Sequence, residues 1–167
     1  MPHELVPVTE LPRYSIMEVE RRWLVDTAAV GDLARIPYRL FEDLYFDCSR
    51  LRLRKITEAS RNAQFKLGKK YGKHSVLSEP ITTLYLTEGE YQQFSGLAGL
   101  FASKRRYAVA GGFLDVYQQP HSGLMIFELE FEDEASARIY LPPHFVTREI
   151  TGDSNFSGFS LAKGNGA

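Results

Sequence analysis

The sequence predicts a mostly β (α+β) protein, in which an antiparallel sheet of eight strands closes into a barrel with short helices outside it. Eight segments have the length and the alternation of strands, and the connections between most of them are short. The two or three expected helices are short and come late in the chain. With 167 residues, of which 44% are hydrophobic, the chain suits one domain with a sizeable core.

Composition excludes several classes of partner. The formal net charge is -1, so the chain has no overall basic field for a nucleic acid polymer or an anionic membrane. Cys48 is the single cysteine, which rules out an internal disulfide and fits a reducing compartment. No apolar run is as long as a membrane span, and the first residues lack a signal-peptide pattern. We therefore expect a soluble cytoplasmic protein, a monomer or a homodimer, whose basic sites are local.

Strand-like segments follow one another along most of the chain. We expect strands at residues 15–25, 38–47, 50–56, 63–68, 77–87, 103–110, 112–117 and 124–131. Residues 57–62 are interpreted as a hairpin loop, and residues 68–74, rich in glycine and lysine, as a solvated turn. Pro80 cannot donate a hydrogen bond to a sheet, which predicts that its strand lies at an edge or begins after the proline.

Helices are expected at residues 88–97, 132–140 and 154–162. Thr87 caps the first of them, because Glu90 follows at the spacing of a capping box. The domain boundaries that follow are an N-terminal arm or tail at 1–14, the barrel domain at 15–162 and a C-terminal tail at 163–167.

Acidic and basic side chains share one face of the first strand. Successive side chains of a strand point to opposite faces, so Glu18, Glu20 and Arg22 lie together, opposite a mostly apolar face. Two carboxylates about 7 Å apart repel each other unless a cation lies between them. A hard divalent cation fits such oxygen ligands. A solvated outer face of an ordinary sheet is the alternative interpretation of this strand.

The polar faces of the other strands segregate by charge, whereas an ordinary protein surface mixes the two signs. The cations lie on the middle strands and are Arg52, Arg54, Lys66, Lys104 and Arg106. If the sheet closes, the first and last strands meet, and Glu18, Glu20, Glu128 and Glu130 form one carboxylate cluster. Four carboxylates suit Mg²⁺ or Mn²⁺, and the cations across the lumen suit a ligand with several negative charges in a row, such as a triphosphate.

Short motifs in a fixed order resemble those of the CYTH proteins, the triphosphate tunnel metalloenzymes. Glu18-Val19-Glu20-Arg21-Arg22 looks like the ExExK signature of that family, and Leu51-Arg52-Leu53-Arg54 is similar to its LRxR segment. Further similar pieces are Asp43-Leu44-Tyr45-Phe46-Asp47, Gln64-Phe65-Lys66, Lys104-Arg105-Arg106-Tyr107, Asp115-Val116-Tyr117, Glu128-Leu129-Glu130 and Glu149-Ile150-Thr151-Gly152-Asp153. The resemblance extends over residues 15–162.

This resemblance implies an eight-stranded tunnel that holds a triphosphate end-on. It implies that Glu18, Glu20, Glu128 and Glu130 bind Mg²⁺ or Mn²⁺, with Glu20 or Glu130 orienting the attacking water. The substrate-binding set that it implies is Arg52, Arg54, Lys66, Lys104 and Arg106. Arg22 stands where the signature ends in lysine, and we add it to the substrate-binding set because it keeps the charge.

The leading functional hypothesis is metal-dependent hydrolysis of a small triphosphate, with inorganic triphosphate as the first candidate. One alternative is a class IV-type adenylate cyclase acting on ATP, which needs a base for the ribose hydroxyl and a pocket for adenine. The other is a module that binds a triphosphate or polyphosphate without cleaving it. This alternative gains support from the strand around Ile81 and Thr83, which lacks most of the acids that CYTH proteins often carry there.

Overall fold

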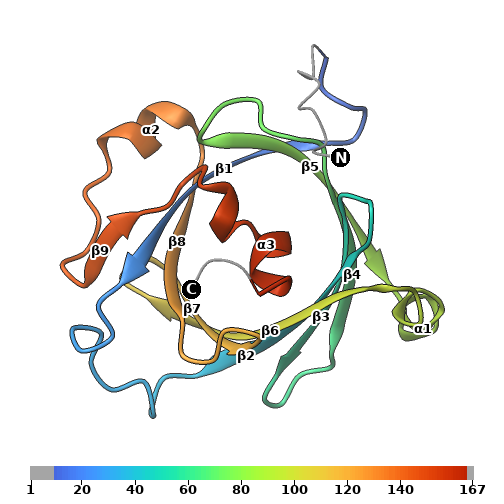
Figure 1. The fold of residues 1–167 in the computed structure, drawn as a ribbon, viewed down its shortest axis with the longest axis horizontal. Helices are drawn as coiled ribbons and strands as arrows, with labels where there is room; N and C mark the ends of the chain where they lie inside the picture. Colours follow the sequence, from blue (N-terminus) through green and yellow to red (C-terminus); the bar gives the residue numbers. More distant parts are fainter. Residues whose placement is uncertain (1–9, 165–167) are drawn as a thin grey trace.

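A computed structural model describes residues 10–164; the predictions for residues 1–9 and 165–167 lie outside this range. The predicted fold class is confirmed, because eight antiparallel strands form a closed barrel (Figure 1). The barrel strands are β1 (Ile16–Val25), β2 (Tyr38–Phe46), β3 (Leu51–Glu58), β4 (Gln64–Lys70), β5 (Ser78–Leu86), β6 (Gly99–Val109), β7 (Gly112–Gln119) and β8 (Met125–Phe131). A short ninth strand, β9 (Val146–Glu149), pairs with β1 beside this ring.

The barrel closes through β1, which pairs with β8 along most of its length and with β5 at its start. Around the ring the order is β5, β4, β3, β2, β6, β7, β8 and β1. The register places Glu20 opposite Glu130, Arg22 opposite Glu128, and Glu18 opposite Glu79. The first and last strands of the barrel therefore meet as the sequence predicted.

Two helices lie outside the ring and a third lies within its outline (Figure 1). The outer ones are α1 (Glu88–Ser95), which has the predicted capping box of Thr87 and Glu90, and α2 (Glu134–Ile139). A short 3-10 helix (Ser154–Phe156) leads into α3 (Gly158–Ala162), so the expected single helix at 154–162 is two pieces. Figure 1 shows α3 inside the circle of strands.

The main apolar core lies on the outer side of the barrel wall. Trp23, Leu114 and Phe127 are buried there, on the strand faces opposite the charged residues. The connection at 26–37 and the segment around Phe145 pack over them. Because this cover removes the outer faces from water, the alternation of each strand directs its polar residues into the barrel.

A second apolar cluster closes one end of the barrel. Leu161 of α3 and Phe156 pack against Tyr117 and Ile126 on the inner faces of β7 and β8. Gly158 permits this approach, because a Cβ at that position would lie 2.1 Å from the hydroxyl oxygen of Tyr45. Arg22 also holds this plug, since its Nη1 donates a hydrogen bond to the carbonyl oxygen of Phe156 at 2.7 Å.

Several predicted boundaries were wrong. The predicted turn at 68–74 begins as strand, because the backbone of Lys69 and Lys70 pairs with β5. Pro80 lies inside β5, opposite Met17 of β1, rather than at an edge or before the strand. The sixth strand starts at Gly99 because it pairs with the whole of β2, and β9 was not predicted. Within residues 10–164, no helix has both the length and the apolar character that crossing a membrane requires.

Candidate functional site

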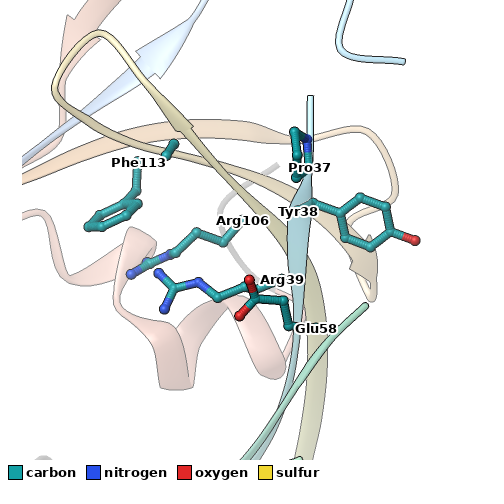
Figure 2. Close-up of a pocket in the computed structure, with 7 residues that line it drawn as sticks. Pro37, Tyr38, Arg39, Glu58, Arg106 and Phe113 are labelled. Carbon is teal, nitrogen blue, oxygen red and sulfur yellow. The ribbon is translucent and has the colours of Figure 1, made fainter. Parts of the chain in front are cut away.

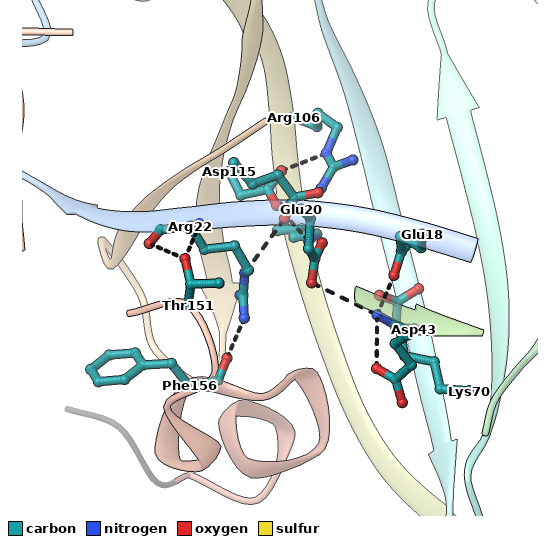
Figure 3. A network of polar contacts seen from close by, with 12 residues as sticks. Glu18, Glu20, Arg22, Asp43, Lys70, Arg106, Asp115, Thr151 and Phe156 are labelled. Atoms are coloured by element: carbon teal, nitrogen blue, oxygen red, sulfur yellow. Dashed lines mark hydrogen bonds and ion pairs between the residues drawn. The ribbon is translucent and has the colours of Figure 1, made fainter. Parts of the chain in front are cut away.

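Every charged residue predicted for the site lies on an inward position of the barrel. The register carries this alternation from strand to strand: Asp43 is opposite Arg54, Arg54 is opposite Lys66, and Arg106 is opposite Asp115. These positions form a lumen that contains both acids and cations (Figure 3). The charged side chains form three groups, and each group has a different ratio of acidic to basic residues.

The first group is an ion pair between neighbouring strands. Nε and Nη2 of Arg54 donate hydrogen bonds to the two carboxylate oxygens of Asp43, at 2.6 and 2.7 Å. Burial alone would raise the pKa of Asp43, but the charge and hydrogen bonds of Arg54 lower it to about 2. Arg54 is therefore held in one orientation before any ligand arrives.

The second group surrounds Asp115, which is fully buried on β7. Arg106 donates two hydrogen bonds to its carboxylate, both at 2.7 Å, and Lys104 donates a third. Arg106 also donates to Glu128, and Nε of Arg22 lies 3.7 Å from that carboxylate. Burial alone would raise the pKa of Glu128, but Arg106, Lys104 and Arg22 hold it well below its usual range.

The third group has an ammonium at its centre (Figure 3). Nζ of Lys70 donates to Oε2 of Glu18 at 2.6 Å, and it lies 3.8 Å from Glu20 and 3.7 Å from Glu79. Burial would lower the pKa of Lys70, but the three carboxylates raise it above its ordinary value. Its side chain keeps 38% of its surface exposed, in contrast to the buried cations around Asp115.

The four predicted metal ligands are thus not gathered in one group. Glu128 is bound by Arg106, whereas Glu18 and Glu20 face Lys70, and Glu130 has no cation within 4.0 Å among residues 10–164. In this part of the chain, no three acids or histidines lie close enough together to hold a metal ion as they stand. In this structure the four carboxylates are therefore not gathered in one cluster, since the register places Glu128 opposite Arg22, and metal binding by these residues stays a prediction.

The remaining carboxylates still suit a cation. Burial and the nearby charges of Glu18, Glu128 and Glu20 raise the pKa of Glu130, so negative charge is in excess around it. The ammonium of Lys70 is already a cation among Glu18, Glu20 and Glu79. Carboxylate oxygens are also the ligands that Mg²⁺ and Mn²⁺ prefer. The residues present therefore fit a divalent cation, provided that the carboxylates draw closer together.

Two of the predicted substrate-binding cations have no acid partner. Within residues 10–164, neither Arg52 nor Lys66 has a carboxylate oxygen within 4.0 Å. Nε of Arg52 is buried and donates no hydrogen bond in this range. Nζ of Lys66 lies 4.9 Å from the centre of the Tyr85 ring. Their charges are therefore available to an anion in the lumen.

A pocket of about 190 Å³ opens at the end of the barrel where β2 begins (Figure 2). Arg39, Arg106, Glu58 and Phe113 are among the residues that line it. The guanidinium of Arg106 therefore reaches from the Asp115 group into this pocket. The α3 plug lies at the opposite end of β2, beside Tyr45, so the lumen is closed there.

Sequence reasoning assigned no site role to Lys70, Glu79, Asp43 or Asp115. Lys70 continues the alternation of Gln64, Lys66 and Gly68 on β4, and this period of two was the signal that could have found it. Glu79 precedes Pro80, which concealed its place on β5. The partnership of Arg106 with Asp115 depends on register, which no motif in the sequence specifies.

Comparisons with known proteins agree with this architecture. No protein-family model matches the chain. The chain is 27% identical over 150 residues to an inorganic triphosphatase of Nitrosomonas europaea, covering 87% of this chain and 96% of that protein. A solved structure of an inorganic triphosphatase gives a TM-score of 0.51 at 20% identity, covering 88% of this chain and 95% of the other. A candidate adenylate cyclase from Bacillus halodurans gives 0.52 at 16%, covering 75% and 86%. These solved structures share the fold with this chain.

Proposed function

We propose that this protein is a member of the CYTH group that hydrolyses a small triphosphate, inorganic triphosphate first, inside the barrel. One observation carries the proposal: the lumen of the barrel contains both cations without acid partners and a group of carboxylates. Arg52 and Lys66 offer positive charge without acid partners, and a group of carboxylates lies across from them. The inorganic triphosphatase similar over 87% of the chain supports the same reaction.

The phosphate chain would be held by two kinds of cation. Within residues 10–164, Arg52 and Lys66 have no carboxylate oxygen within 4.0 Å, and so they supply the main attraction for the anion. Arg54, Lys104 and Arg106 are fixed by Asp43 and Asp115, which orients their remaining N–H groups before the substrate enters. Such fixed donors stabilise charge that develops on phosphate oxygens without reorganising.

Glu18, Glu20, Glu79 and Glu130 would hold Mg²⁺ or Mn²⁺. When bound, the cation supplies positive charge to phosphate oxygens. Glu128 is not required for this role, because Arg106 already binds it. Glu20 and Glu130 are opposite each other on β1 and β8, so either carboxylate can orient the water that attacks the terminal phosphorus.

The test is release of phosphate from inorganic triphosphate with Mg²⁺ and with Mn²⁺. Wild type should release phosphate, and Glu18→Gln should lose nearly all of the activity, because the variant lacks a metal-binding carboxylate. Glu88→Gln is the matched control, since Glu88 is an exposed acid on α1, outside the barrel. Intact triphosphate after incubation with folded wild type and either metal would overturn the proposal.

A nucleotide substrate is the second candidate, and the pocket at the open end favours it. Phe113 and Tyr38 line this pocket beside Arg106, so an organic group attached to a triphosphate would meet aromatic surface there. Incubation with ATP separates the outcomes: cyclic AMP with pyrophosphate indicates a cyclase, and ADP with phosphate indicates a hydrolase. Tight binding of triphosphate with no product indicates a binding module instead.

A further inference from the structure

Lys70 is a cation of the site to which the proposed function gives no role, and the inference about it rests on that function. Its ammonium lies among carboxylates from two other strands, Glu18 and Glu20 of β1 and Glu79 of β5. The shortest of the three distances is 2.6 Å, to Glu18. These carboxylates are three of the four that the proposed function assigns to the divalent cation.

We infer that Lys70 is a built-in competitor of the metal: its ammonium occupies the cation position in the metal-free protein, and a divalent cation must displace it to bind. Mg²⁺ binds oxygen at about 2.0–2.1 Å, and larger divalent cations at slightly longer distances. The oxygens of Glu20 and Glu79 lie 3.8 and 3.7 Å from Nζ, so these carboxylates must move inward around a smaller ion. An ammonium and a divalent cation repel each other strongly at such separations, so the two cannot share the position.

The surroundings of Lys70 allow it to leave. Its side chain is 38% exposed, whereas those of Lys104 and Arg106 are 9% and 8% exposed and both are bound to Asp115. A lysine also has a flexible four-carbon stem, which lets the ammonium move while the backbone of β4 stays paired. The Asp115 group lacks this freedom, so a metal is expected among Glu18, Glu20 and Glu79 rather than there.

One oxygen of the Glu79 carboxylate has a hydrogen-bond partner other than Lys70. The backbone N–H of Gly72 donates a hydrogen bond to its Oε1 at 2.9 Å. Gly72 has a φ of +108°, and a Cβ there would lie 2.2 Å from Nη1 of Arg50, so this turn requires glycine. When the ammonium departs, Glu79 therefore stays at the site as a metal ligand. The displaced ammonium stays within reach of the lumen, where its charge favours a polyphosphate.

Binding of Mn²⁺ to the purified protein without any phosphate tests this inference, by electron paramagnetic resonance of the free ion. Lys70→Met removes the ammonium and keeps an unbranched side chain, so its affinity for Mn²⁺ should rise about tenfold or more. Lys69→Met is the matched control, because Lys69 is the exposed neighbour on the outer face of β4, and its affinity should equal that of wild type. Equal or weaker binding by Lys70→Met, relative to wild type, would overturn the inference.

Lys70→Arg keeps the positive charge and adds hydrogen-bond donors. This variant tests the inference if Lys70→Met does not fold. This variant should bind Mn²⁺ several-fold more weakly than wild type, because a guanidinium can grip a carboxylate with two hydrogen bonds. Tighter binding by Lys70→Arg would contradict the inference. Phosphate release by wild type is measured in a separate assay, which tests the proposed function. A wild type that hydrolyses triphosphate while Lys70→Met shows no gain in Mn²⁺ affinity overturns the role of Lys70 alone.

Discussion

The ion pair of Asp43 with Arg54 permits a quantitative test of how the interior charges are held. The two side chains are 4% and 11% exposed, and two hydrogen bonds of 2.6 and 2.7 Å join them. Burial opposes the charged form of Asp43, yet the arginine lowers the pKa of that carboxyl from 3.8 to about 2. The charged acid is therefore more stable in the folded protein than in the unfolded chain.

The size of the effect follows from the two pKa values. Each pH unit between them corresponds to about 1.36 kcal/mol, so the charged Asp43 contributes roughly 2 kcal/mol to the free energy of unfolding at neutral pH. Because the folded pKa is the lower one, this contribution is complete above the unfolded value and is lost as the pH falls from about 4 to about 2. Asp43→Asn also leaves Arg54 buried without its acid, so we expect a destabilisation of about 2–4 kcal/mol at neutral pH.

Urea unfolding of wild type and Asp43→Asn over this pH range measures the difference directly. Other acids also titrate there, but subtracting the two proteins isolates Asp43. Glu42→Gln is the control, because Glu42 lies on the opposite face of β2, 31% exposed and 3.7 Å from Lys55. This control substitution should lower the free energy of unfolding by no more than about 1 kcal/mol. If Asp43→Asn is as stable as the control, or if its stability deficit does not shrink in acid, the ion pair does not stabilise the fold in this way.

Three further predictions concern the lumen and the plug. Arg52→Ala should raise the KM for triphosphate roughly tenfold or more, because a hydrogen bond to a charged group contributes about 1.5–3 kcal/mol; an unchanged KM in steady-state kinetics would remove Arg52 from the binding set. Glu128→Gln should lower the free energy of unfolding by about 1–3 kcal/mol, since Arg106 loses a charged partner; a loss of activity at full stability would point to metal binding by Glu128 instead. Gly158→Ala should destabilise by about 1–3 kcal/mol, because its Cβ would meet the Tyr45 hydroxyl. Its control Gly89→Ala, with no atom within 4 Å, should be neutral or slightly stabilising, and thermal unfolding that ranks the two the other way would contradict the packing at the plug.

Alternation along single strands was enough to predict that the charged residues named for the site face the lumen, although Lys70 and Glu79 were not among them. Glu18, Glu20 and Arg22 on β1 and Glu128 and Glu130 on β8 share one face because a strand repeats every two residues. The closed sheet was also predictable, since the acids at the two ends of the chain are explained by strands that meet. The structure places these residues in one lumen, and their roles in binding and catalysis stay predictions.

The partners within the lumen depend on register, which the sequence does not specify. Glu128 lies opposite Arg22 and is bound by Arg106, so it does not join the other carboxylates. Lys70 was not predicted to lie in the lumen, for a different reason. The glycines on both sides of it are typical of a turn, but backbone pairing with β5 keeps the segment extended through Lys70. Tertiary pairing thus overrode a local signal.

The short elements near the end of the chain were the least predictable. β9 contains four residues and follows two prolines, so no alternation could identify it. The position of α3 within the barrel depends on Leu161 and Phe156 packing against inward residues of β7 and β8. Such a contact joins distant segments, and five helical residues carry too little pattern to predict it.

The most direct test of the central claim is ³¹P nuclear magnetic resonance of inorganic triphosphate incubated with the protein and Mg²⁺. Wild type and the double variant Arg52→Ala/Lys66→Ala, both shown to be folded, should be compared under the same conditions. Wild type should convert triphosphate to pyrophosphate and phosphate in equal amounts, and the double variant should leave it intact. No conversion by wild type, or equal conversion by both proteins, would contradict hydrolysis in the charged lumen.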